Sequence, residues 1–230
     1  MLIKKWEKLP ENMQLEEIRP YYEILRKKNF SLFCKRVFDI VVSFILLLIC
    51  FIPFIILAIA IKIDSKGPVF YRQERVTQYG KKFRIFKFRT MCNNADQIGA
   101  HVTSENDMRI TKVGKFIRKL RLDEVSQLID VFRGTMTFVG TRPEVSEFVD
   151  KYTPEMMATL LLPAGVTSTA SICFKDEDEI LAKSEGDISE VYINEVLPKK
   201  MEYNLQAIKE YSFFKEIAIM FKTVIAVFKK

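Results

Sequence analysis

The chain has 230 residues, which is enough for one domain with its own hydrophobic core. Its 36 basic and 29 acidic side chains give a formal net charge of +7, a modest excess that suits a membrane surface or an anionic substrate as well as nucleic acid. The single histidine, His101, disfavours a multi-histidine metal site, and four scattered cysteines form no zinc or redox motif. Carboxylates, basic groups and a hard cation are therefore expected to carry any chemistry.

The first 36 residues form a predicted amphipathic segment. Pro10 and Pro20 divide it, and residues 21–33 mix aromatic with basic side chains. This pattern predicts a helix that lies either on a membrane interface or on the protein as an ordinary surface helix. No apolar core follows the first lysines, so a signal peptide is not expected here.

A run of 22 uncharged, mostly large and apolar residues extends from Ile40 to Ile61. As a helix it would measure roughly 33 Å, close to the thickness of a bilayer core. Pro53 interrupts the run, removing one helical hydrogen bond and clashing with the preceding turn. Basic residues flank both ends, so the positive-inside rule places both flanks on the cytoplasmic side; these residues are Lys35, Arg36, Lys62, Lys66, Arg72 and Arg75.

These features predict a re-entrant helix over residues 37–63 that bends at Ile52–Pro53 and returns to the same membrane face. A single kinked transmembrane helix is the alternative. Asp39 lies at the entrance of the run, and because an unpaired charge in lipid is costly, it is expected to face a polar partner.

Turn residues at 64–68 end the helix, and a β-hairpin is predicted next, with arms at Val69–Val76 and Lys82–Met91. The second arm interleaves aromatic and basic side chains, including Lys87 and Arg89. A half-buried strand has this pattern, and so does a surface that binds single-stranded nucleic acid.

The stretch from Arg118 to Glu144 holds the densest candidate chemistry. Asp123 and Glu124 are adjacent, with Arg118 before them and Arg142 after them. A carboxylate can attack or hold a metal while guanidinium groups grip phosphate oxygens, so this mixture suits a phosphate site. A solvated ion-pair helix is the alternative.

Two helices are expected around the acidic pair. The first, from Ile110, carries Val113, Phe116, Ile117 and Leu120 on one face, and the second continues to Phe132, where Gly134 ends it. Residues 138–144 and 163–168 are expected to be loops, and the four acids at 176–179 to be solvated.

Near the C-terminus, residues 213–228 predict an amphipathic helix with Ser212 as its cap. Its apolar face could pack on the domain or on lipid.

Four ordered motifs resemble those of the bacterial sugar transferase family, the monotopic polyprenyl-phosphate phosphoglycosyl transferases. They are Lys35–Asp39, Gly67–Arg75, Phe83–Met91, and Arg109–Gly114 continuing to Asp123 and Glu124. The resemblance extends from about Lys35 to the loop at Pro163 and is looser beyond it.

The chain departs from the family pattern at several positions. Ser126 stands where the family has a proline, and Thr135 stands where it has an acid before methionine. The Gly-Pro-Arg-Pro motif has Thr141 as its second residue, and the Pro-Gly-Ile-Thr-Gly loop appears as Pro163-Ala-Gly-Val-Thr-Ser168. Because the acidic pair and its arginines are intact, these changes bear on substrate choice more than on the reaction.

The resemblance implies an α+β, mainly helical, monotopic membrane protein. After the re-entrant helix, residues 64–195 would form a small catalytic domain with a β-hairpin on the cytoplasmic face of the bacterial inner membrane, and residues 196–230 would form amphipathic interface helices.

The resemblance also implies a reaction. Sugar-1-phosphate would pass from a UDP-sugar to undecaprenyl phosphate with release of UMP, as the initiating step of exopolysaccharide, capsule or glycoprotein glycan synthesis. Asp123 would be the nucleophile that forms an aspartyl phospho-sugar. Mg²⁺ is expected near Asp123 and Glu124. Arg118 and Arg142 would position phosphates, with Lys87 and Arg89 as weaker candidates.

Two other functions fit parts of the sequence. A membrane-anchored module that binds acidic lipid or acts as a scaffold would need only the positive charge. A nucleic-acid binder is disfavoured, because the basic residues also flank a bilayer-length apolar run, and no nucleic-acid partner is expected.

Overall fold

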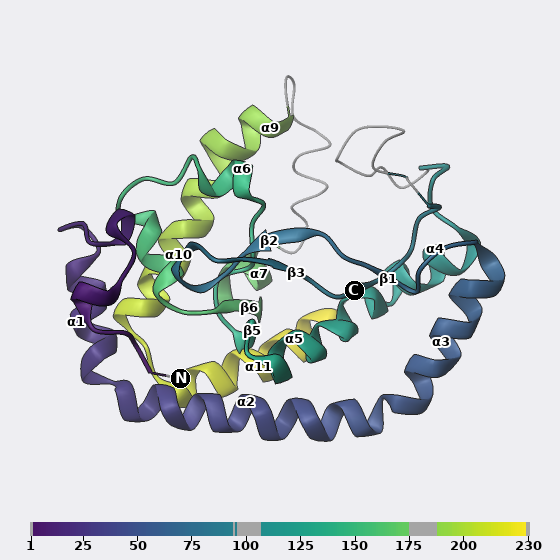
Figure 1. The fold of residues 1–230 in the computed structure, drawn as a ribbon, viewed down its shortest axis with the longest axis horizontal. Coiled ribbons are helices and arrows are strands. Elements are labelled where there is room, and N and C mark those ends of the chain that lie inside the picture. The colour runs from purple at the N-terminus through teal and green to yellow at the C-terminus, as the bar shows by residue number, and fades with distance from the viewer. Residues whose placement is uncertain (1, 94, 96–106, 175–187, 229–230) are drawn as a thin grey trace.

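The computed structural model describes residues 2–93, 95, 107–174 and 188–228. Within these ranges the fold is α+β and mainly helical, as predicted, with helices arranged around three two-stranded sheets (Figure 1). His101 and the acidic run at 176–179 lie outside the described residues.

The apolar run forms two helices, α2 (Asn29–Ile49) and α3 (Phe51–Asp64), which meet at an angle of 60°. The break lies at Cys50 and not at Ile52–Pro53, so the predicted position of the bend was wrong. A proline ring clashes with the carbonyl four residues earlier, which here belongs to Ile49, and α2 ends at that residue. In the described part of the chain no single helix is long and apolar enough to cross a membrane, whereas this bent pair passes by length and composition.

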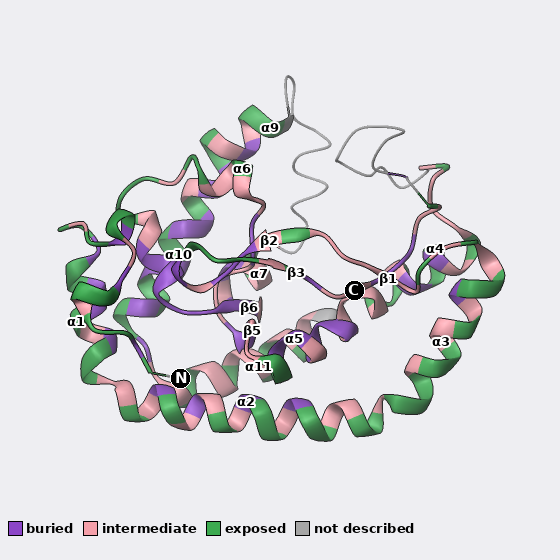
Figure 2. Cartoon of the chain, in the orientation of Figure 1, coloured by how far each residue is buried: buried purple, intermediate pink, exposed green. Residues whose placement is uncertain are grey.

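One side of the bent pair is apolar and exposed over its whole length, as the green positions along α2 and α3 show in Figure 2. The other side of α2 packs against α5 (Leu128–Arg133) and strand β5 (Met136–Val139), and α3 packs against α4 (Lys112–Lys119). The exposed side includes Phe33, Val41, Phe44, Leu48, Ile49, Phe51, Ile52, Ile55, Ile56, Ile59 and Ile63.

Charged residues near the start of α2 point into the protein. Asp39 is 1% exposed and its Oδ2 accepts a 2.6 Å hydrogen bond from Thr137, which confirms the expected polar partner. Lys35 is buried and donates to the Val139 carbonyl at 2.8 Å and to Glu216 at 2.5 Å. Arg36 donates to two carbonyls at the C-terminal end of α5, where the helix dipole favours a cation.

The predicted hairpin is confirmed, although each arm is interrupted. Strand β1 (Phe70–Tyr71) pairs antiparallel with β4 (Lys87–Phe88), and β2 (Glu74–Val76) pairs antiparallel with β3 (Lys82–Arg84). The connecting turn contains the 3₁₀ segment Gln78–Gly80, in which Tyr79 and Gly80 both have positive φ.

A second, parallel pair was not predicted. Strand β5 runs beside β6 (Ala164–Thr167). All of β6 and the last two residues of β5 lie in the stretches predicted to be loops, 163–168 and 138–144, so those predictions were wrong at these residues. The two backbones approach so closely that a Cβ on Gly165 would lie 2.2 Å from the Gly140 nitrogen. Small residues at these two positions therefore permit the pairing.

The N-terminal segment belongs to the protein core. It contains the 3₁₀ turns Trp6–Lys8 and Glu11–Met13 and helix α1 (Arg19–Lys27). Tyr21, Tyr22 and Leu25 are buried against α10 (Leu197–Lys209) and the 3₁₀ helix Met156–Leu161. The apolar face of α1 therefore contacts protein, as the surface-helix alternative predicted, whereas residues 29–33 of the predicted helix belong to α2, where Phe30 and Phe33 are exposed.

The remaining helices are α4, α6 (Ser146–Val149), α7 (Thr169–Cys173), α9 (Ile188–Val191), a π-helix at Tyr192–Val196 and α11 (Phe213–Phe228). Helix α11 lies along α2 (Figure 1) and packs Ile219 and Met220 onto the core around β5 and β6. Its other face leaves Phe214, Phe221, Val224 and Ile225 exposed.

Candidate active site

Asp123 and Glu124 lie on η5 (Leu122–Gln127), a short 3₁₀ helix between α4 and α5. Arg121 has φ of 51°, in the left-handed region, and this backbone conformation turns the chain sharply from α4 into η5. Ser126 is fully buried, with its Oγ 3.0 Å from the Phe86 carbonyl and 3.1 Å from the Asp123 carbonyl. Ser126, which stands where the family has proline, therefore holds η5 against the hairpin through its hydrogen bond to Phe86.

Glu124 is held by two cations from different elements. Its Oε1 accepts from Lys87 on β4 at 3.2 Å and from Arg142, after β5, at 2.5 Å. The second Arg142 nitrogen lies 3.4 Å from Oε2. Three predicted site residues, separated by up to 55 positions in the sequence, thus meet in one cluster.

The two acids differ in their electrostatic surroundings. Burial alone would raise the pKa of Glu124, but the charges of Arg142 and Lys87 outweigh it and lower that pKa, so the carboxylate is ionised. Burial and, second, the negative charge of Glu124 raise the pKa of Asp123, and Lys87 and Arg118 only partly oppose this. Burial also lowers the pKa of Lys87, against the attraction of Glu124.

Asp123 is half-buried, and in the described part of the chain its carboxylate forms no ion pair with a cationic side chain. Its neighbour Glu124 takes the hydrogen bonds of both Lys87 and Arg142. Asp123 is therefore the carboxylate that remains available to a ligand.

The two other predicted arginines occupy different places. Arg118 lies at the end of α4, donates from Nε to Thr90 at 2.9 Å, and its charge acts on the Asp123 carboxyl. Arg89 is 5% exposed and donates to the backbone carbonyls of Ser65 and Lys66 at 2.7 and 3.1 Å. These bonds fix the end of α3, so the structure does not bring Arg89 into the Glu124 cluster.

No group of three or more metal-ligating side chains occurs among the described residues. Mg²⁺, however, is commonly held by one or two protein carboxylates together with substrate phosphates and water. Asp123, with the less engaged Oε2 of Glu124, fits that smaller requirement.

A buried network behind Arg142 was missed in the sequence. Glu144 accepts from Tyr192 at 2.5 Å and from Lys200 at 3.3 Å, and Lys200 also donates to the Tyr192 hydroxyl at 2.8 Å. Arg75 donates to the Pro143 carbonyl at 3.2 Å and lies 3.9 Å from Glu144. These contacts hold the turn that carries Arg142. The positions of Tyr192 and Lys200, 48 and 56 residues beyond Glu144, gave no local signal.

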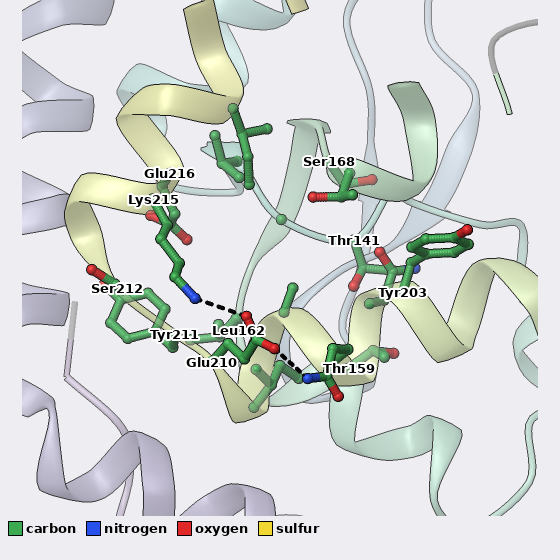
Figure 3. Close-up of a pocket in the computed structure, with 18 residues that line it drawn as sticks. Thr141, Thr159, Leu162, Ser168, Tyr203, Glu210, Tyr211, Ser212, Lys215 and Glu216 are labelled. Carbon is green, nitrogen blue, oxygen red and sulfur yellow. Dashed lines mark hydrogen bonds and ion pairs between the residues drawn. The ribbon is translucent and has the colours of Figure 1, made fainter. Parts of the chain in front are cut away.

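A cavity of about 200 Å³ lies between the C-terminal ends of β5 and β6 and helices α10 and α11 (Figure 3). Thr141, the residue before Arg142, lines it.

A sequence profile of a family described as bacterial sugar transferase matches residues 30–230. The UDP-N-acetylgalactosamine-undecaprenyl-phosphate N-acetylgalactosaminephosphotransferase of Aeromonas hydrophila is 35% identical over 195 residues, which cover 84% of this chain and 43% of that protein. The UDP-glucose:undecaprenyl-phosphate glucose-1-phosphate transferase of Klebsiella pneumoniae is 34% identical over 194 residues, with coverage of 83% and 39%. The undecaprenyl-phosphate galactose phosphotransferase of Salmonella typhimurium is 30% identical over 218 residues, with coverage of 88% and 42%. The chain therefore spans about two fifths of the length of these relatives.

Proposed function

Since the chain belongs to the bacterial sugar transferase family, we propose that it transfers sugar-1-phosphate from a UDP-sugar to undecaprenyl phosphate and releases UMP. The names of its relatives, which act on undecaprenyl phosphate with different sugars, support this reaction. The observation that carries the proposal is the contrast within the acidic pair: Glu124 is clamped by Lys87 and Arg142, while Asp123 beside it is available.

Asp123 is the nucleophile in this proposal. Its carboxylate oxygen attacks the phosphorus that bears the sugar, the bond from that phosphorus to the UMP oxygen breaks, and UMP leaves. The aspartyl phospho-sugar is then attacked by a phosphate oxygen of undecaprenyl phosphate, which breaks the aspartyl–phosphorus bond and restores the Asp123 carboxylate. A covalent intermediate divides one difficult transfer into two easier ones.

The cations around the acidic pair serve the phosphates. Arg142 and Lys87 keep Glu124 ionised, and Arg118 adds positive charge near Asp123. A bound Mg²⁺, held by Asp123 and Glu124, would neutralise charge on the diphosphate, against which an attacking carboxylate is otherwise repelled.

The lipid acceptor requires a site at a membrane, and the α2–α3 pair supplies the anchor in this proposal. It enters the bilayer, bends at Cys50 and returns, so the catalytic domain stays on the cytoplasmic face of the inner membrane. The exposed apolar side of the pair supports this. Further support comes from Phe116 and Leu120 on α4 and Phe214 and Phe221 on α11, which are also exposed.

The test is UMP release by the detergent-purified protein with a panel of UDP-sugars, undecaprenyl phosphate and Mg²⁺. Release with at least one sugar is expected, and Asp123→Asn should lower it by about 10³-fold or more, because removal of a covalent nucleophile is among the most damaging substitutions. A chelator should also stop it. Asp150→Asn, which makes the same change on an exposed acid, is the control.

Folded protein that releases no UMP with any nucleotide sugar would instead favour the scaffold or lipid-binding module. That alternative predicts that Asp123→Asn leaves function in cells intact. As the first committed step on the lipid carrier, the proposed reaction would initiate synthesis of an exopolysaccharide, capsule or glycoprotein glycan.

A further inference from the structure

The cavity in Figure 3 is built from two unlike kinds of wall. Aliphatic side chains, among them Val139, Leu162 and Ile219, form part of it. Hydroxyl and amide groups form the rest, from Thr141, Ser168, Thr169, Tyr203 and Asn204. A lining of this kind suits a neutral group that has both apolar surface and several hydrogen-bonding atoms.

The charged residues that line the cavity are already paired. Lys215 lies 2.7 Å from Glu210, a pair drawn as a dashed line in Figure 3, and Glu216 lies 2.5 Å from Lys35. A phosphate would have to break one of these pairs to find a cation. Arg142 and Lys87 do not line the cavity, and these two cations are the ones proposed to bind the phosphates of the substrate.

Asn204 is the strongest sign of a ligand. It is 5% exposed, and in the described part of the chain its amide makes a single weak contact, from Nδ2 to the Met201 sulfur at 3.8 Å. Neither of its amide atoms is a buried atom without a partner, and its oxygen accepts no hydrogen bond from the described residues, so a ligand in the cavity can donate one to it. A polyprenyl chain in the cavity would leave this amide unsatisfied, whereas a hydroxylated ring would bond to it.

Two departures from the family motifs meet at this cavity. Thr141 stands where the motif has proline, and Ser168 stands where the other motif has its final glycine. They follow the neighbouring strands β5 and β6, and both line the cavity. Within the described residues the Thr141 hydroxyl makes no hydrogen bond, while the Ser168 hydroxyl caps α7 by accepting from the Ser171 amide. Both add hydroxyl groups that the motif residues lack.

We infer that this cavity holds the sugar ring of the nucleotide donor, and that Thr141, Ser168 and Asn204 determine which sugar is accepted. This inference rests on the proposed function and adds the place where the sugar is chosen. Thr141, the residue before Arg142, lines the cavity, and in this inference the sugar of a donor whose phosphates lie at Arg142 and Asp123 reaches the cavity past Thr141. Relatives of similar identity are named for different sugars, so local residues must distinguish them.

The test measures equilibrium binding, because it then does not depend on turnover. In the full chain carrying Asp123→Asn, dissociation constants are measured for a panel of UDP-sugars and for UMP. Adding Asn204→Leu should raise the dissociation constant of the preferred UDP-sugar about tenfold, which is the usual effect of losing a buried hydrogen bond. The dissociation constant of UMP should stay unchanged. Asn194→Leu, the same change at an exposed position, should alter neither.

Two further variants keep the inference testable if Asn204→Leu does not fold. Thr141→Val replaces the hydroxyl by a methyl group of similar size. It should raise the dissociation constant of the preferred UDP-sugar by a few-fold and leave that of UMP unchanged. Thr141→Pro with Ser168→Gly restores the motif residues and should change the order of preference among UDP-sugars in the panel.

The inference is overturned if these folded variants bind every UDP-sugar as before. It is equally overturned if binding of UMP and binding of the UDP-sugars weaken together, since the cavity would then hold the nucleobase. A rise in only the KM for undecaprenyl phosphate, measured in the active enzyme, would also overturn it. Failure of the parent protein to bind both UMP and UDP-sugars would refute the proposed function itself, which is a different outcome.

Discussion

Asp123 and Glu124 are chemically similar neighbours whose surroundings act on them in opposite directions. Two cations lower the pKa of Glu124, while burial and, second, the charge of Glu124 raise the pKa of Asp123. A carboxylate with a raised pKa is a better nucleophile once ionised than one held by salt bridges. The pair can therefore divide its work, with Glu124 organising the cations and Asp123 reacting.

This arrangement predicts the pH dependence of kcat/KM, which follows groups in the free enzyme. Activity should fall as pH decreases through the raised pKa of Asp123, because the protonated carboxyl cannot attack. Glu124→Gln removes the neighbouring negative charge, so the acidic limb of the residual activity should move to lower pH. Arg118→Gln removes a cation that lowers this pKa, so the limb should move to higher pH.

Shifts of the two limbs in the same direction would contradict the assignment of Asp123 as the titrating group. The variant Asp150→Asn should leave the profile unchanged, because Asp150 is exposed.

At the scale of elements, the site depends on the hydrogen bonds that hold two short segments in place. The turn after β5 supplies Arg142, and the Glu144 network secures it to the π-helix and α10. The acidic turn η5 is fastened to the hairpin through Ser126. No side chain in the Glu144 network or the Ser126 contacts is proposed to touch the substrate.

Glu144→Gln should increase the KM for the donor about tenfold, because Arg142 loses its fixed position, and should reduce stability by about 1–3 kcal/mol, since buried Lys200 loses the charge of Glu144. Adding Lys200→Met removes the lysine charge that faced Glu144 and should restore most of the melting temperature. The KM should stay high in this double variant. Recovery of both properties together would show that Glu144 serves stability alone.

Ser126→Ala should cost about 1 kcal/mol, equivalent to a decrease in melting temperature of about 2–4 °C for a chain of this size. The reason is that the buried Oγ lies within hydrogen-bond distance of two carbonyls. Ser146→Ala is the matched control, since the buried Ser146 Oγ has no hydrogen-bond partner among the described residues. Equal melting temperatures for the two variants would contradict the fastening role of Ser126.

Across the whole molecule, apolar surface is gathered on α2, α3 and α11, while the acidic pair lies between α4 and α5. Such a large exposed apolar area on a folded chain marks a contact with lipid or protein. The proposed re-entrant arrangement would keep all remaining elements on one side of the bilayer.

Cysteine labelling checks this arrangement. In a background with the four native cysteines replaced by serine, Glu7→Cys before α2 and Lys82→Cys after α3 are both exposed. Both should react in opened vesicles and neither should react with an impermeant reagent applied to the periplasmic side. Labelling of one of them from that side would show a single kinked span instead.

Much of this architecture could be predicted from the sequence where the pattern is local. The bilayer-length run, the hairpin and the acid–arginine stretch are examples. Strands β5 and β6 escaped prediction because each is four residues long and mostly buried, so neither shows an alternating pattern. Helix α1 has the composition of an interface helix, and only its contacts with α10 show that its apolar face meets protein. The cavity between β5, β6, α10 and α11 depends on residues from widely separated segments, which no spacing rule brings together.

The buried charges of α2 also constrain the order in which the protein can be completed. Asp39 finds its hydroxyl partner 98 residues later in the chain, and Lys35 finds its carboxylate 181 residues later. At about 5–20 residues per second, the ribosome needs roughly 10–35 s to make the stretch between Lys35 and Glu216. During that interval Lys35 lacks Glu216, and until Thr137 is made Asp39 lacks its hydroxyl partner. Closure of the α2 interface around Lys35 therefore waits for α11.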